Sequence, residues 1–159
     1  MAARADRQRV AGLMYRRILV PLEHSSYDRV ILDHVRQLAT MCQSSIVLIH
    51  VADGWAARNQ LSLKLRESEE MRVDRDYIES VCASLRTEGF DTESILAGGD
   101  PASEIAGAAD REGCDLIAMA THGHKGIQDL LYGTTANGVR HRTMVPVLMV
   151  RGPVGGRPR

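Results

Sequence analysis

The amino-acid sequence predicts an α/β fold in which a single open parallel sheet is covered by helices on both faces. Most of the five strand-like runs are apolar at nearly every position, which is typical of strands buried on both faces. Segments with apolar residues at helical spacing separate these runs, so each strand is expected to lead into a helix. The chain has 159 residues, a length that suits one domain with one core.

The first four segments follow this order. Residues 18–22 form a short apolar run that is expected to be the first strand. From 27 to 41, apolar residues recur at helical spacing and predict the first helix. Residues 45–51 are apolar on both faces and predict the second strand, and 53–60 is expected to be a loop.

The middle of the chain predicts two further helices on either side of a weaker strand. Residues 61–88 carry a long apolar stripe at helical spacing, and Gly89 is expected to end this helix. Residues 92–97 are half polar and are expected to form the third strand. Pro101 is well placed in the first turn of the next helix, which is expected to end at Gly113.

The last third of the chain predicts two strands, with a loop and a helix between them. The run 115–120 is expected to be a buried strand, 134–142 a helix and 145–150 the last strand. Residues 1–14 contain scattered arginines and are expected to form a flexible arm. Residues 152–159, rich in Gly, Pro and Arg, are expected to form a flexible tail.

Charge and composition argue against several classes of partner. Twenty basic and twenty acidic residues cancel, so no net charge attracts nucleic acid or an anionic membrane. Aromatic residues are too few for a platform that stacks single-stranded bases. No apolar run approaches the roughly 18 residues that span a bilayer. Cys42, Cys82 and Cys114 lie far apart without a CxxC, which fits a reducing cytoplasm and argues against disulfides or a cysteine zinc site.

The segment after the fourth predicted strand is the strongest indication of function. Gly123 lets the backbone approach a ligand closely, and the expected helix start offers unpaired N–H groups and the positive end of the helix dipole. These features predict a ligand that carries phosphate, with a nucleotide favoured, although the G-x-x-x-x-G-K-[ST] pattern of P-loop NTPases is absent. The segment comprises Ala120, Thr121, His122, Gly123 and His124, with Gly133, Thr134 and Thr135 at the expected helix start.

A second group of candidate residues follows the first strand. Pro21, Leu22 and Glu23 lie at its end, and if strands one and four are neighbours, Glu23 faces the glycine loop. Its carboxylate could accept hydrogen bonds from ribose hydroxyls or from a base amine. Capping roles remain open for Glu23 or Ser25 at the next helix, and for Thr134 at the last one.

Several histidines and core positions also have two interpretations. His122 and His124 have His-x-His spacing, but without a third ligand they are favoured as exposed loop groups that hydrogen-bond phosphate, and no metal site is expected. Val51 and Met119 are expected core residues whose backbone could edge a base pocket. His50 is expected to have a structural role.

The glycine loop, its helix and the last strand resemble the universal stress protein family. Nucleotide-binding members carry the pattern G-x2-G-x9-G-[ST] between the fourth strand and the last helix. Here Ala120, Gly123, Gly133 and Thr134 occupy the defined positions, and nine residues separate the two glycines.

Other parts of the chain agree with this resemblance, namely the segments 18–21, 48–53 and 99–101. The resemblance covers roughly residues 15–151, which are expected to form one domain. It implies a five-stranded parallel sheet of order 3-2-1-4-5, like that of the adenine nucleotide alpha-hydrolases. This order places strands one and four side by side.

The resemblance also implies ligands and partners. Some family members bind ATP or AMP, others bind no nucleotide, and here an adenine nucleotide is expected, with or without Mg²⁺. A homodimer through the apolar last strand, 145–150, is implied as well, since an exposed apolar edge strand invites pairing. The implied nucleotide site consists of Pro21, Leu22, Glu23, Val51, Met119, Ala120, Thr121, His122, Gly123, His124, Gly133, Thr134 and Thr135.

Two residues depart from the pattern of the nucleotide-binding members. Ala120 stands at the first glycine, where a methyl group can crowd a phosphate or ribose, and Glu23 stands where an Asp is usual, with a longer and looser reach. An adenine-nucleotide-binding stress-response regulator is favoured, and no catalytic residue is assigned. A nucleotide-free dimeric interaction module and a weak ATPase using Glu23, His122, His124 and Lys125 are the alternatives.

Overall fold

The computed structural model describes residues 14–52, 69–121 and 129–152, with the backbone alone for 129–134. Strands and helices alternate along the described residues, as the sequence predicts. In chain order they are β1 (Arg17–Leu22), α2 (Asp28–Cys42), β2 (Ser45–Ala52), α4 (Glu69–Thr87), β3 (Thr92–Gly98), α5 (Pro101–Arg111), β4 (Leu116–Thr121), α6 (Asp129–Arg142) and β5 (Val147–Arg151).

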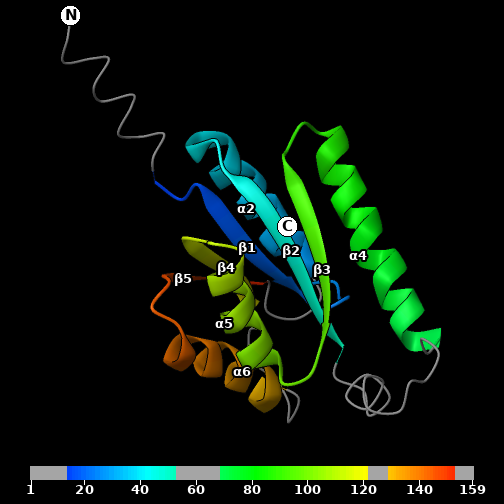
Figure 1. The fold of residues 1–159 in the computed structure, drawn as a ribbon, viewed down its shortest axis with the longest axis vertical. Coiled ribbons are helices and arrows are strands. Elements are labelled where there is room, and N and C mark those ends of the chain that lie inside the picture. The colour runs from blue at the N-terminus through cyan, green and yellow to red at the C-terminus, as the bar shows by residue number, and fades with distance from the viewer. Residues whose placement is uncertain (1–13, 53–68, 122–128, 153–159) are drawn as a thin grey trace, which may run out of the picture.

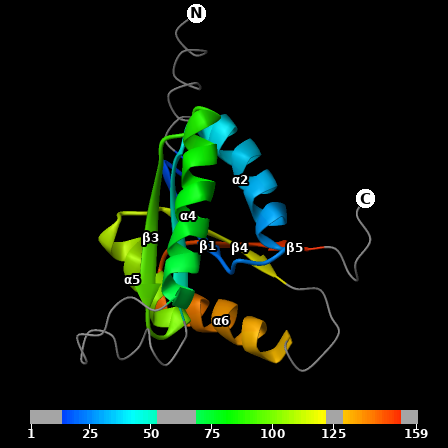
Figure 2. The same ribbon diagram turned by 90° about the vertical axis from the view of Figure 1, so that its right-hand side faces the viewer.

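The strands form one parallel sheet in the order β3-β2-β1-β4-β5, which confirms the expected 3-2-1-4-5 arrangement. Helices α2 and α4 lie on one face of this sheet, and α5 and α6 lie on the other (Figures 1 and 2). The weaker, half-polar β3 and the apolar β5 are the two edge strands. The buried strands β1, β2 and β4 lie between them, which explains why their sequences are the most continuously apolar.

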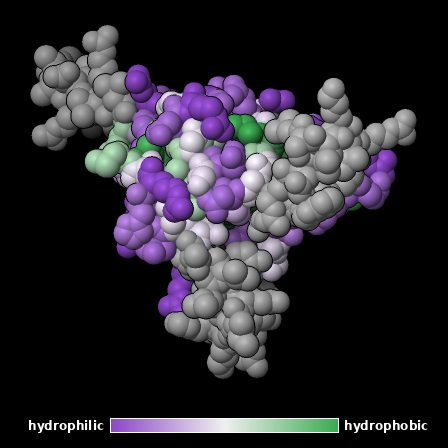
Figure 3. Space-filling view, turned by 60° about the horizontal axis from the view of Figure 1, so that its bottom comes forward, coloured by the Kyte–Doolittle hydropathy of each residue, from purple (hydrophilic) through white to green (hydrophobic). Residues whose placement is uncertain are grey.

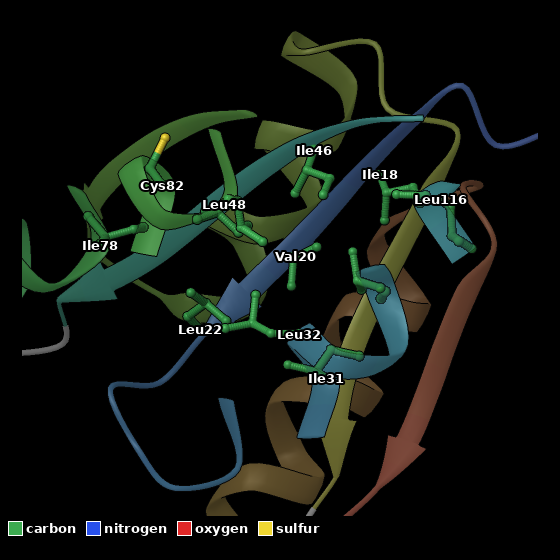
Figure 4. Close-up of a cluster of buried hydrophobic side chains, with 14 residues drawn as sticks. Ile18, Val20, Leu22, Ile31, Leu32, Ile46, Leu48, Ile78, Cys82 and Leu116 are labelled. Atoms are coloured by element: carbon green, nitrogen blue, oxygen red, sulfur yellow. The ribbon is translucent and has the colours of Figure 1, made fainter. Parts of the chain in front are cut away.

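Alternate residues of the central strands supply two hydrophobic cores. Ile18, Val20 and Leu22 of β1 point toward α2 and α4, where they pack with Ile31 and Ile78 (Figure 4). Leu19, between them in sequence, belongs to the core beneath α5 and α6. Because successive side chains of a strand point to opposite faces, the single strand β1 contributes to the cores on both faces of the sheet.

Local capping explains where α5 begins. The Asp100 carboxylate accepts hydrogen bonds from the Ser103 backbone N–H at 2.9 Å and from its hydroxyl at 2.6 Å, and Pro101 follows in the first turn. Gly99 precedes the cap with φ of +136°, a conformation that side chains rarely adopt. The turn expected before the third helix is confirmed.

Helix α6 begins earlier than the sequence predicts. The expected start was residue 134, but the helix extends from Asp129, so Gly133 and Thr134 lie inside it and Thr134 is not its N-cap. Leu130 and Leu131 favour helix, Asp129 suits the positive end of the dipole, and one interior glycine costs only about 1 kcal/mol.

The remaining boundaries differ little from expectation. Strand β5 begins at Val147 instead of residue 145 and ends one residue later than expected. The described part of the long helix expected over 61–88 is α4, and the loop expected over 53–60 lies outside the described residues. None of the helices in the described part of the chain is long and apolar enough to cross a membrane.

Candidate functional site

The neighbouring strands β1 and β4 lie where the winding of the sheet reverses, and they part toward their carboxyl ends. The pairing of β1 with β4 joins Ile18 to Leu116 and Leu19 to Ile117, near the start of both strands. The pairing of β1 with β2, by contrast, continues to Leu22. In open α/β sheets, ligands bind beyond the strand ends at such a switch point. The structure therefore places a candidate site between the ends of β1 and β4.

Seven of the predicted site residues lie at the carboxyl ends of β1, β2 and β4 in the structure. Pro21 and Leu22 end β1, and Glu23 follows directly. Val51 lies near the end of β2, the neighbour of β1 on its other side. Met119, Ala120 and Thr121 form the end of β4. His122, Gly123 and His124 lie outside the described residues.

These residues divide between the two faces of the sheet. Met119 and Val51 pack in the core beneath α5 and α6, the helix that carries Gly133, Thr134 and Thr135. Ala120 packs against the opposite core, with α2 and α4. The Ala120 methyl group is therefore directed away from the face that α6 covers.

Asp28, in the first turn of α2, organises the segment that contains Glu23. Its side chain is buried, with 3% of its surface exposed. One carboxylate oxygen accepts a hydrogen bond from the Glu23 N–H at 2.9 Å, and the other accepts from the Ser25 N–H at 3.1 Å. The second oxygen also accepts from the Tyr77 hydroxyl of α4 at 2.5 Å. A buried carboxylate thus holds the backbone on both sides of His24.

This arrangement changes the expected capping of α2. Tyr27 occupies the N-cap and makes no side-chain cap bond, so neither Glu23 nor Ser25 is the cap residue. The Ser25 hydroxyl accepts a hydrogen bond from the Tyr27 N–H at 3.3 Å, which is a local turn contact. The negative charge near the helix start comes from Asp28, where the helix dipole favours it.

Tyr77 acts as a hydrogen-bond donor in this cluster. Burial of the phenol, together with its hydrogen bond to the Asp28 carboxylate, raises the pKa of Tyr77 far above its usual value. The phenol therefore keeps its proton throughout the physiological range. Its ring also stacks on the His24 imidazole, with ring centroids 4.0 Å apart and an interplanar angle of 10°.

Asp74, one turn before Tyr77 on α4, lies between two histidines. His24 Nδ1 is 3.2 Å from one Asp74 carboxylate oxygen, and His50 Nε2 is 3.2 Å from the other. His50 Nδ1 is 2.8 Å from the carbonyl oxygen of Leu22, the last residue of β1. The buried His50 thus links the end of β1 to α4, which fits the structural role expected for it.

The two contacts of His50 fix the orientation of its ring. The Leu22 carbonyl can only accept a hydrogen bond, so His50 Nδ1 carries a hydrogen. His50 Nε2 then faces a carboxylate oxygen of Asp74 at 3.2 Å. Among the residues that the structure describes, no group of three or more His, Cys, Asp or Glu could hold a metal ion.

A further contact joins the start of α2 to the ends of β4 and β5. The Gly152 N–H donates to the Thr121 carbonyl at 3.0 Å, which fixes the residue after β5 beside the end of β4. A Cβ added at Gly152 would lie 2.5 Å from the Tyr27 ring, so the backbone there packs directly against that ring. This contact bounds the candidate site on the side of β5.

The surface near this end of the molecule is mostly hydrophilic where it is described. Figure 3, which brings the lower part of Figure 1 forward, shows polar residues over most of the coloured area and apolar residues in small separate patches. The described part of this face therefore suits a polar ligand better than a large apolar partner.

Sequence reasoning missed the residues that hold the Glu23 segment. Asp28 follows Glu23 by five positions, and Tyr77 is part of the apolar stripe of its helix. The only sequence indication was a carboxylate near the end of the first strand. Nothing in the sequence pairs it with Tyr77, 49 residues away.

Comparisons with known proteins agree with the fold. The model of the universal stress protein family matches residues 14–151. Universal stress protein MJ0577 from Methanocaldococcus jannaschii is 28% identical over 160 residues, with 88% of this chain and 97% of the relative covered. The solved structure of MJ0577 is similar with a TM-score of 0.72 and covers 89% of this chain and 99% of that one.

Solved structures at lower identity share the fold. The universal stress protein from Archaeoglobus fulgidus in complex with dAMP has a TM-score of 0.62 at 18% identity and covers 86% of this chain and 98% of that one. A universal stress protein in complex with cAMP has a TM-score of 0.65 at 20% identity, with 86% and 97% covered. Because the family model matches nearly the whole sheet and its helices, this chain belongs to the universal stress protein family.

Proposed function

We propose that this protein binds an adenine nucleotide, ATP or AMP, between the carboxyl ends of β1 and β4 and acts as a cytoplasmic stress-response regulator. The observation that carries the proposal is the switch point at which β1 and β4 part beyond Leu19 and Ile117, with Glu23 held there by a buried carboxylate. Two proteins of the same fold are known in complex with dAMP and cAMP, which supports an adenine nucleotide as the ligand.

The faces of the sheet suggest how the ligand would lie. Val51 and Met119 face the α5 and α6 side and would border the base. Glu23, at the end of β1, would accept hydrogen bonds from the ribose hydroxyls or the base amine. The phosphates would lie toward α6, and Mg²⁺, where present, would be held chiefly by the phosphate oxygens.

The early start of α6 changes which groups would contact phosphate. The unpaired N–H groups of a helix belong to its first four residues, which here are 129–132. Within this proposal, these amides supply the positive end of the dipole, and Thr134 and Thr135 contribute hydroxyl groups. His122, Gly123 and His124 complete the phosphate site in the proposal, as the family pattern implies.

Ala120 is compatible with this site. Its methyl group packs with the α2 and α4 core, whereas Met119 and α6 lie on the other face. A ligand on the α6 side would therefore meet the backbone at position 120 and not the methyl group. This placement supports nucleotide binding over a nucleotide-free module.

Adenine nucleotides are expected to raise the melting temperature of the purified, nucleotide-free protein. At a ligand concentration 100-fold above Kd, linkage adds about 2.7 kcal/mol. For a domain of this size, that corresponds to a rise of roughly 5–10 °C. The measurement is thermal unfolding with ATP, AMP or GTP, with and without Mg²⁺, and adenine nucleotides are expected to give the larger shift.

Four variants distinguish a specific site from general stabilisation. Glu23→Gln and Gly133→Val are expected to reduce or abolish the shift, and Ala120→Gly is expected to retain it. Glu79→Gln, at an exposed position of α4, is the matched control for the loss of one carboxylate. No shift with millimolar ATP or AMP in the unmodified chain would overturn the proposal.

Phosphate release from ATP in the same samples tests the weak-ATPase alternative.

We also propose that two copies pair through β5. This strand is an edge of the sheet, and within the described residues it pairs with β4 along one side. Met149 is 49% exposed and Met144 fully exposed, so apolar side chains flank a strand edge that can accept a partner. A nucleotide-dependent arrangement of the segment at 121–132 could then be read by the partner copy or by another protein.

The dimer is expected to have twice the 17.5 kDa mass of the chain in size-exclusion chromatography with light scattering. Met149→Lys places a charge at the proposed interface and is expected to shift the population toward monomer, because a desolvated unpaired charge opposes association. Met41→Lys is the matched control, since Met41 is a 78% exposed methionine that belongs to α2 and not to β5. A monomeric unmodified chain at micromolar concentration would contradict this arrangement.

A further inference from the structure

We propose that Tyr77 and Asp74 of α4 are positioning residues that hold the Glu23 segment in its ligand-binding conformation. The inference rests on the proposed nucleotide site, to which it adds two residues on a helix outside that site. Tyr77 and Asp74 are three positions apart and so lie on the same face of α4. Tyr77 contacts Asp28 and His24, and Asp74 contacts His24 and His50.

The first connection passes through Asp28. The Tyr77 hydroxyl donates to the same Asp28 oxygen that accepts the Ser25 N–H, while the other oxygen accepts the Glu23 N–H. A carboxylate side chain can rotate about its own bonds, and the hydrogen bond from Tyr77 fixes that rotation. The position of the Glu23 backbone therefore depends on a hydroxyl group of α4.

The second connection passes through the two histidines. Asp74 contacts His24 with one oxygen and His50 with the other, both at 3.2 Å. His50 in turn contacts the Leu22 carbonyl. The residues immediately before and after Glu23 are thus both tied to Asp74.

The backbone conformation between these contacts needs such support. His24 has φ of +59°, in the left-handed region that non-glycine residues seldom occupy. Residues in this region persist when surrounding contacts hold them there. The contacts that hold His24 are the Tyr77 ring stacked on its imidazole and the Asp74 carboxylate beside its Nδ1. Without these two contacts, the backbone at His24 is expected to leave this conformation, and Glu23 is then no longer held in one orientation.

The charged and titratable groups around this cluster come from several elements. Asp74 and Tyr77 belong to α4, Asp28 to α2 and His50 to β2, while His24 lies in the segment between β1 and α2. Asp28 accepts a hydrogen bond from the Tyr77 hydroxyl, His24 stacks on the Tyr77 ring, and Asp74 contacts both imidazoles. Polar contacts therefore join the segment to α4.

Tyr77→Phe tests the proposal, because it removes the hydroxyl and keeps the ring that stacks on His24. The measurements are amide hydrogen exchange of Glu23 and Ser25, relative to amides of β2, and the Kd for ATP by calorimetry. The loss of a hydrogen bond to a buried carboxylate is expected to speed exchange of both amides by on the order of tenfold, and to raise the Kd several-fold. Ser84→Ala is the matched control, since Ser84 is an exposed residue of the same helix whose hydroxyl contacts the Glu88 carboxylate at 3.4 Å, and it is expected to change neither quantity.

A lower melting temperature in Tyr77→Phe, with unchanged relative exchange and unchanged Kd, would overturn the proposal and leave Tyr77 a merely structural residue. Asp74→Asn, which keeps the side-chain shape, provides a second variant with the same expected loss of protection at Glu23 and Ser25. If the unmodified chain binds no ATP, the proposed function fails and the binding consequence fails with it. The exchange of the two amides still decides whether α4 holds the segment.

Discussion

Asp28→Ala is expected to lower the free energy of unfolding by about 3–4 kcal/mol, because it removes the acceptor for three hydrogen bonds at once. Hydrogen bonds to a charged group each contribute about 1.5–3 kcal/mol, and water recovers part of this loss for the exposed Ser25 N–H. In this variant the half-buried Tyr77 hydroxyl loses its hydrogen-bond acceptor. The favourable charge at the start of α2 is lost as well.

Urea denaturation of Asp28→Ala and of the unmodified chain measures this loss. The dependence of the free energy of unfolding on urea concentration is compared between the variants. Asp33→Ala is the matched control, because Asp33 is an exposed carboxylate of the same helix that pairs at the surface with Arg29 and Arg36. Exposed pairs of this kind contribute at most about 1 kcal/mol, so the control is expected to change stability little. Equal effects in the two variants would mean that the three bonds at Asp28 add nothing beyond an ordinary surface charge.

The sequence was sufficient to predict most of the sheet because burial imposes its own pattern. Runs such as 18–22 and 45–51 are apolar on both faces, and only a central parallel strand requires this. Strand neighbours do not follow from such patterns. That β1 lies beside β4 came from a family resemblance, and the structure bears it out. With that adjacency, the ends of β1 and β4 could be predicted to lie together.

Two features could not be predicted, for different physical reasons. The start of α6 was misplaced because Gly133 followed by Thr134 has the composition of a helix start, while the propensity of the preceding residues extends the helix to Asp129. The contacts of Asp28 with Tyr77 and of His24 with Asp74 join residues about fifty positions apart. Local periodicity carries no information on such pairs, and they form only once α4 packs on the sheet.

Gly138→Val is expected to lower the free energy of unfolding by about 2–3 kcal/mol, because it overpacks the contact between α5 and α6. A Cβ at position 138 would lie 2.8 Å from the Cβ of Ala102, a distance that side chains essentially never show. Ala102 is 6% exposed and its methyl group is fixed to the α5 backbone, so it cannot rotate away. One helix must therefore move, which outweighs the few tenths of a kcal/mol that Val gains over Gly in helix propensity.

Gly107→Val is the matched control, since Gly107 also lies within a helix but its added Cβ would meet the flexible end of Arg111. That variant is expected to stay within about 0.5 kcal/mol of the unmodified chain. Adding Ala102→Gly to Gly138→Val is expected to recover at least about 1 kcal/mol, as a double-mutant cycle by urea denaturation would measure. A double-mutant cycle with no coupling between positions 102 and 138 would contradict this prediction, because the added side chain would then be accommodated without a loss of stability. With coupling, the same displacement of α6 is also expected to weaken the proposed nucleotide binding, because Gly133 and Thr134 move with the helix that carries them.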